Sequence, residues 1–209
     1  KISSIREKIN HRVGMMKQFG RITLACFLVI ILNACSKQEI PNAKNWDVGD
    51  FTFTDQDENS VSRDDLKGKV WIADFIFTNC TTVCLPMTSN MTKLQNMIAE
   101  EGLEDVHLVS FSVDPANDKP SVLKEYGQSF QVDFDNWSFL TGYEQETIEA
   151  LAQESFKTIV QKPAEGDQVI HGTSFSLVDQ NGTIVQQYSG VEEIPFDDII
   201  KHIKILQSN

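Results

Sequence analysis

The near-continuous apolar run Val70–Phe77 limits the possible folds of this chain more than any other segment. It is rich in β-branched and aromatic residues, which is typical of a strand buried on both faces. A strand of that kind needs a sheet whose two sides are both covered. The sequence therefore predicts an α/β fold built around this strand.

The flanking patterns predict the other elements of such a fold. Phe51–Thr54 alternates like a strand and the chain re-enters at Val61, which indicates an N-terminal hairpin. Asn181 and Gly182 are expected to supply the positive φ angles of a tight hairpin turn. Their order, with two parallel crossovers and then a hairpin, predicts a thioredoxin-like fold with an extra N-terminal β-hairpin. Further helices and strands are expected at 82–101, 106–113, 121–130, 137–140, 144–156, 173–178, 183–188 and 196–206.

Cys80 and Cys84 come directly after the central strand, where the next helix begins. Free backbone N–H groups and the helix dipole at such a junction favour thiolate over thiol. A four-residue step places both side chains on one helical face if the turn is regular. The pair would close too small a loop to serve as a structural staple. We therefore expect a redox or metal-binding pair, with two buried core cysteines as the alternative.

His171 is the third candidate ligand. It lies in a polar loop, residues 167–174, that enters a core strand and contains no proline. In a thioredoxin-like topology this loop passes over the cysteine pair and normally carries a proline that shields the sulfurs. We expect His171 to be a ligand, although a lone histidine is more often a surface or hydrogen-bonded residue. His107 and His202 are expected to be structural or exposed.

Two thiolates and one imidazole suit copper, because thiolates hold Cu(I) and the imidazole adds a nitrogen ligand for Cu(II). Zinc accepts the same ligands, but a structural zinc site usually has a fourth protein ligand. Met87 and Met91 offer thioethers, yet their helical spacing matches a core stripe. Asp114 could position the loop or hydrogen-bond a ligand, or it could only form the turn before Pro115.

Residues 1–34 have the features of a bacterial lipoprotein signal. Six Lys/Arg precede the apolar stretch Ile22–Leu32, which is too short to span a bilayer comfortably. Cys35 follows after Asn33 and Ala34 and is expected to be the lipidated first residue of the mature protein, with an uncleaved anchor as the alternative. Cys26, inside the apolar stretch, is expected to be incidental.

Both interpretations place the folded part on the extracytoplasmic face of a bacterial membrane. We expect a lipidated anchor and linker at 35–45 and a single domain at 46–209. Removal of residues 1–34 leaves 12 of 18 Lys/Arg and 29 of 30 Asp/Glu, a formal net charge of −17. Because phosphate binding needs clustered Lys/Arg, we expect no nucleic-acid partner.

Several segments resemble the signature sequences of the Sco/SenC family of copper proteins, over roughly residues 46–206. The lipoprotein-like N-terminus and the segment Asp135–Trp137 are most similar to members from Gram-positive bacilli. The resemblance implies a membrane-tethered metallochaperone that helps to build the copper A centre of cytochrome c oxidase, with the copper A-bearing subunit as partner. It also implies that Cys80, Cys84 and His171 bind one copper ion. The similar segments are Phe77–Cys84, Ser112–Pro115, Phe139–Gly142 and Val169–His171.

Two positions depart from the family pattern. Leu85 separates Cys84 from Pro86, where many members have Cys-Pro, and this should shift the helix start slightly. Ile170 precedes His171 where many members have Asp, so a carboxylate that could orient the imidazole is missing.

Two other functions remain open for the same residues. In a thiol–disulfide reductase, Cys80 and Cys84 would reduce the copper A-site cysteines of the oxidase subunit, without any need for His171. A peroxidase of the peroxiredoxin kind is less favoured, because no Arg or Lys lies near Cys80 in the sequence to stabilise a peroxidatic thiolate.

Overall fold

The structure is a computed structural model that describes residues 39–80 and 82–208, and this part of the chain belongs to one compact unit. The predictions for Cys26, Cys35 and the lipoprotein signal lie outside the described residues. Among the described helices, none has the length and apolar character needed to cross a membrane.

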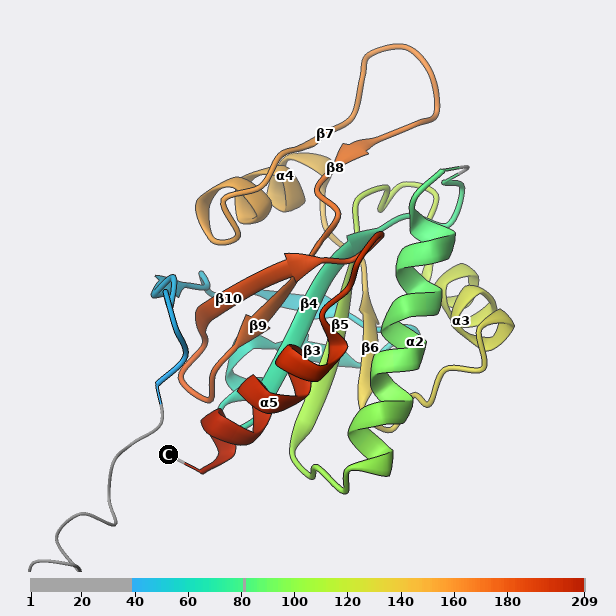
Figure 1. Cartoon of the computed structure of the whole chain (residues 1–209). Helices are drawn as coiled ribbons and strands as arrows, with labels where there is room; N and C mark the ends of the chain where they lie inside the picture. The colour runs from blue at the N-terminus through green and yellow to red at the C-terminus, as the bar shows by residue number, and fades with distance from the viewer. Residues whose placement is uncertain (1–38, 81, 209) are drawn as a thin grey trace, which may run out of the picture. The chain divides into compact units, whose positions relative to one another are not determined.

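A six-stranded mixed sheet forms the centre of the fold, in the order β1-β10-β9-β4-β5-β6 (Figure 1). β4 is parallel to β5, and β5 is parallel to β6, whereas β9 pairs antiparallel with both β4 and β10. All seven residues of β4 are buried, which confirms the predicted central strand. The strands are β1 (Trp46–Asp47), β4 (Val70–Ile76), β5 (Val106–Ser112), β6 (Trp137–Leu140), β9 (Ser174–Val178) and β10 (Thr183–Ser189).

Helices cover the sheet, and α2 and α5 lie together on one face of it (Figure 1). α2 buries Met87, Met91, Leu94 and Ile98, the stripe expected from their spacing. This stripe packs away from water because apolar residues three and four positions apart share one helical face. The helices are η1 (Arg63–Leu66), α2 (Cys84–Glu100), α3 (Pro120–Ser129), α4 (Gln145–Glu154) and α5 (Phe196–Gln207).

An aromatic cluster fills the opposite face. The predicted N-terminal hairpin, β2 (Thr52–Thr54) and β3 (Ser60–Ser62), is present. Phe51, beside this hairpin, contacts Trp71 and Phe111 edge to face, with ring centroids 6.4 and 5.4 Å apart. Full burial of an aromatic side chain contributes about 2–3 kcal/mol to the free energy of unfolding. The aromatic packing beside the hairpin therefore stabilises this side of the core.

Three local features differ from the sequence predictions. Asn181 lacks the predicted positive φ; only Gly182 has one, at 84°, because the Asp179 carboxylate accepts the amides of Asn181 and Thr183 and fixes a different turn. Ile40, in the predicted linker, is buried. The backbone of Lys44 donates to the Val185 carbonyl, so this part of the linker packs on β10.

The third difference is a small ribbon at the end of the sheet. β7 (Val160–Gln161) pairs antiparallel with β8 (Ile170–His171), where the sequence predicted only a polar loop. Such short strands are beyond any periodic signal in the sequence. β8, which contains His171, lies at the end of the sheet where α2 starts (Figure 1).

Candidate metal centre

The structure brings together the three predicted ligands. Donor atoms of Cys80, Cys84 and His171 all lie within 4.8 Å of one another, although His171 is 87 residues from Cys84. The His171 Nε2 atom is 3.3 Å from the Cys84 sulfur. Both cysteines are buried free thiols, and the histidine is half-buried. Two sulfurs and one nitrogen therefore converge on a single point beyond the end of β4, an interior strand of the sheet.

The cysteine pair is shaped by the turn between β4 and α2. α2 begins at Cys84, and its first amide donates to the Cys80 sulfur at 3.4 Å. Val83, at the N-cap, provides no side-chain cap, and the Cys80 sulfur satisfies one of the amides at the helix start that have no carbonyl partner within the helix. Pro86 is tolerated in the first turn, where its missing N–H has no helical partner to lose.

This arrangement corrects two expectations. The helix begins at Cys84 instead of residue 82, because residues 82 and 83 form a bend, and the first helical amide points at the Cys80 sulfur. The two cysteines therefore do not share a helical face. Their side chains meet because Cys80 stands in front of the helix rather than on it.

The imidazole of His171 is oriented by its own backbone neighbour. Its Nδ1 atom lies 2.9 Å from the Gly172 carbonyl oxygen, which can only accept, so Nδ1 carries the proton. The neutral ring then presents the Nε2 lone pair to Cys84, as a metal ligand must. The ring also meets Phe77 edge to face at 5.8 Å. Gly172 has no room for a side chain, because a Cβ there would lie 2.0 Å from Thr158 Oγ1.

The protonation behaviour of the two thiols is asymmetric. Burial acts to raise the pKa of Cys80, but hydrogen bonds from Cys84 and Thr82 outweigh it and hold that pKa below the usual value. Burial, followed by the hydrogen bond to Cys80, raises the pKa of Cys84 well above the usual value. The prediction that this junction favours thiolate is thus confirmed for Cys80 and wrong for Cys84. Burial also lowers the pKa of His171, against the opposing hydrogen bond to Gly172, so the ring stays neutral.

A buried carboxylate fixes the loop that carries Cys80. Asp118, in the segment after β5, accepts hydrogen bonds from the Thr78 hydroxyl and the Ser112 hydroxyl, each at 2.6 Å. It also accepts the Thr78 amide at 3.3 Å. Burial raises the pKa of Asp118, and these hydrogen bonds oppose the rise. The two loops at the ends of β4 and β5 are therefore tied together beside the cysteine pair.

Asp114 engages groups other than the three candidate ligands. Its carboxylate accepts hydrogen bonds from Lys162 Nζ at 2.5 Å and from Asn117 Nδ2 at 2.7 Å. Its carbonyl accepts the amides of Asn117 and Asp118, so Asp114 also forms the turn that follows β5. The side chain is only 1% exposed and thus needs both partners.

The remaining candidates take structural places. Met87 and Met91 are fully buried in the core stripe of α2, as their spacing indicated. His107 lies 3.1 Å from the Ser138 hydroxyl, and His202 lies 2.6 Å from the Tyr188 hydroxyl. These four side chains belong to packing and hydrogen bonding elsewhere in the domain.

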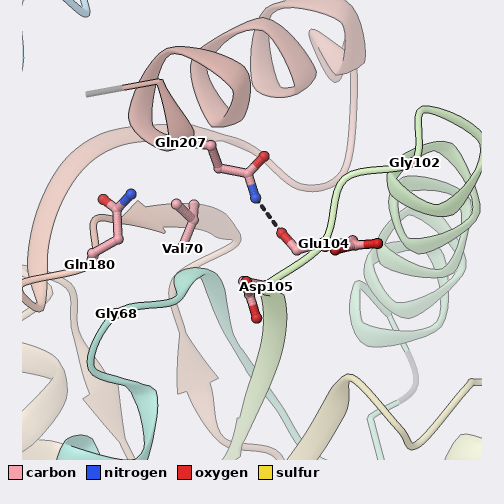
Figure 2. A pocket seen from close by; sticks show the side chains of 7 residues that line it. All are labelled: Gly68, Val70, Gly102, Glu104, Asp105, Gln180 and Gln207. Carbon is pink, nitrogen blue, oxygen red and sulfur yellow. Dashed lines mark hydrogen bonds between the residues drawn. The ribbon is translucent and has the colours of Figure 1, made fainter.

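A pocket of about 340 Å³ lies at the opposite end of the central strands. Figure 2 shows it between the start of β4, at Val70, and the segment before β5, at Glu104 and Asp105. Gln207 reaches across from α5 to the Glu104 carbonyl (Figure 2). Its lining contains no cysteine or histidine, so this pocket is separate from the metal centre.

Three residues near the candidate metal centre were not predicted from the sequence. Lys162 and Asp118 act through partners distant in the sequence, which no local pattern reveals. Asp74 could have been recognised from the sequence, because it is a single carboxylate within the apolar run of β4. It is fully buried and accepts from the Ser110 hydroxyl at 2.6 Å, while its Oδ2 atom has no hydrogen-bond partner among the described residues. Burial, opposed by that hydrogen bond, raises the pKa of Asp74 to about 7.

Comparisons with known proteins agree with the geometry. The family model described as SCO1/SenC matches residues 41–207. The SCO1 protein homolog of Bacillus subtilis is 51% identical over 180 residues, covering 86% of this chain and 93% of that protein.

Solved structures extend the similarity to the fold. BsSco, described as a Sco-family cytochrome c oxidase assembly protein with a disulfide switch, is 51% identical with a TM-score of 0.76, covering 82% of this chain and 99% of that one. Yeast Sco1 with copper bound is 26% identical with a TM-score of 0.62, covering 75% and 87%.

Proposed function

Because the chain belongs to the SCO1/SenC family, we propose that it binds copper through Cys80, Cys84 and His171 and serves as an assembly factor for the copper A site of cytochrome c oxidase. The observation that carries this proposal is the convergence of three soft or borderline donor atoms within 4.8 Å. The copper bound by yeast Sco1 and the oxidase assembly role ascribed to BsSco support it. The copper ion is cargo that the protein receives and passes on.

The donor set fits copper better than the alternatives. Thiolates are the ligands that Cu(I) prefers, and an imidazole nitrogen accommodates Cu(II). Cys84 gives up a proton when it becomes a ligand, so metal uptake and proton release are coupled at this buried thiol. His171 needs no deprotonation, because burial keeps its ring neutral with Nε2 directed at the sulfurs.

Copper titration of the purified chain tests the proposal. We expect one copper ion per chain and, for the Cu(II) form, an optical band from thiolate-to-copper charge transfer. His171→Ala should weaken Cu(II) binding and alter this band, because one donor is removed. His107→Gln is the matched control, since it removes an imidazole that lies 3.1 Å from Ser138 and outside the site. Failure of the wild-type chain to bind one equivalent would end the proposal.

A thiol–disulfide reductase is the second candidate, favoured by the asymmetry of the two thiols. Cys80, whose pKa is lowered, would attack a target disulfide as the thiolate and form a mixed disulfide. Cys84 would then lose its proton, attack Cys80 and release the target as a dithiol. One disulfide is reduced and one is formed, with two electrons passing to the target. The disulfide switch described for BsSco supports this chemistry.

A cell assay separates the two functions. In a strain that lacks this protein but makes the oxidase subunits, complemented with His171→Ala, retained assembly of the copper A site would favour the reductase, since its chemistry needs only the dithiol. Loss of assembly with this variant would favour copper carriage. Cys84→Ser abolishes both and serves as the negative control.

We propose that Cys35 tethers the domain to the extracytoplasmic face of the membrane. The support is the sequence alone, in which Cys35 follows a short apolar stretch and a basic N-terminus. Cys35→Ser should abolish incorporation of labelled fatty acid and release the protein from the membrane fraction. Continued lipid labelling of this variant would contradict the assignment.

A further inference from the structure

One ion pair links the His171 ribbon to the body of the domain. Lys162 directly follows β7, and its ammonium donates to the Asp114 carboxylate at 2.5 Å. Asp114 follows β5, so the contact joins segments 48 residues apart. The carboxylate is 1% exposed and the lysine side chain 28%. Because both groups are withdrawn from water, this pair is screened much less than a surface salt bridge.

The β7–β8 ribbon connects this ion pair to the candidate metal centre. Val160 of β7 pairs directly with His171 of β8. The Lys162 amide also donates to the Glu149 carboxylate at 3.0 Å, which holds the same point of the ribbon to α4. Between β7 and β8 the chain makes a long excursion away from the sheet (Figure 1). This fixed point next to β7 therefore limits the movement of the pair that carries the imidazole, together with the hydrogen bond from Gln168 Nε2 to the Asn79 carbonyl at 3.1 Å on the β8 side.

We propose that Lys162 is a positioning residue for His171. Held by Asp114, its ammonium keeps the β7–β8 ribbon over the cysteine pair and so keeps Nε2 within 3.3 Å of the Cys84 sulfur. Ile170 provides no carboxylate beside the imidazole, and the orientation of the ring comes from the Gly172 carbonyl together with this anchored ribbon. The consequence for copper affinity rests on the proposed function, whereas the consequence for the ribbon does not.

The test uses Lys162→Met, which removes the charge and keeps an apolar stem of similar length. In the metal-free protein we expect amide exchange across residues 160–171 to become about tenfold faster than in wild type. Loss of a group that orients a ligand typically lowers metal affinity 10–100-fold, so Cu(II) binding should weaken by about tenfold with an altered nitrogen signature in its electron paramagnetic resonance spectrum. Lys162→Arg should restore both readouts, because it keeps the ion pair.

Two further variants keep the proposal falsifiable. Lys204, on the terminal helix α5, forms an exposed ion pair with Glu101 at 2.6 Å. Lys204→Met removes this ion pair and should change neither readout. Asp114→Asn combined with Lys162→Met avoids a buried unpaired charge, so overall stability should recover while the ribbon still exchanges fast.

The outcomes separate the two claims. Unchanged ribbon exchange in Lys162→Met, or wild-type ribbon protection in the double variant, would overturn the positioning role. If wild type fails to bind copper, the proposed function fails, and the exchange measurements on metal-free protein still decide the role of Lys162.

Discussion

Asp74→Asn should stabilise this protein at pH 8, and its effect on the free energy of unfolding should become more favourable as pH rises. Asp74 is fully buried in β4, where its carboxylate accepts the Ser110 hydroxyl and its Oδ2 atom lacks a partner among the described residues. An amide has the same shape, can still accept from Ser110 and cannot ionise. The substitution therefore removes the cost of a buried charge, against a pH-independent cost of about 1–3 kcal/mol for amide N–H groups buried where Oδ2 has no partner.

The magnitude follows from the pKa of Asp74, which burial raises from 3.8 to about 7. Since each pH unit corresponds to about 1.4 kcal/mol, ionised Asp74 lowers the free energy of unfolding by at most about 4 kcal/mol. The folded state holds this proton more tightly than the unfolded state. The contribution of Asp74 is thus fully favourable below about pH 4 and is lost as pH rises to about 7.

Urea unfolding of the reduced protein at pH 5.5 and pH 8 measures this effect. The advantage of Asp74→Asn over wild type should grow by about 2 kcal/mol between these two pH values. Asp64→Asn, which removes an exposed carboxylate from η1, controls for the change in net charge. An advantage of Asp74→Asn that stays constant with pH, or is absent at pH 8, would refute the reasoning.

Two further predictions concern the core and the loop that carries Cys80. Met87→Leu combined with Met91→Leu conserves volume but removes both thioethers, so copper stoichiometry should not change and the free energy of unfolding should fall by less than about 2 kcal/mol; a lost copper equivalent would make them ligands. Asp118→Ala leaves the buried Ser112 hydroxyl and the half-buried Thr78 without their acceptor, and should lower the free energy of unfolding by about 3 kcal/mol in urea titration. A loss below about 1 kcal/mol would contradict that role.

Much of the fold could be predicted because its signals are local. The apolar run at Val70–Phe77 and the three- and four-residue spacing on α2 each report a buried face directly. The β7–β8 ribbon could not be predicted, since two-residue strands have no period and form only because their partners meet. The prediction of a positive φ at Asn181 was wrong because the carboxylate of Asp179, two residues earlier, accepts the Asn181 amide.

The candidate site divides in the same way. Cys80, Cys84 and His171 were identifiable by residue type and by the topology that brings them together. Their environment could not be predicted from the sequence, because the raised pKa of Cys84 comes from burial by residues spread over the chain. The pairing of Lys162 with Asp114 joins two loops and has no counterpart in any local pattern.

X-ray absorption spectroscopy of the copper-loaded protein tests the central claim most directly, because it counts the atoms bound to the metal. We predict two sulfur ligands and, for Cu(II), a nitrogen ligand that disappears in His171→Ala. A spectrum with fewer than two sulfurs, or with an imidazole signal unchanged in that variant, would contradict the proposed copper site.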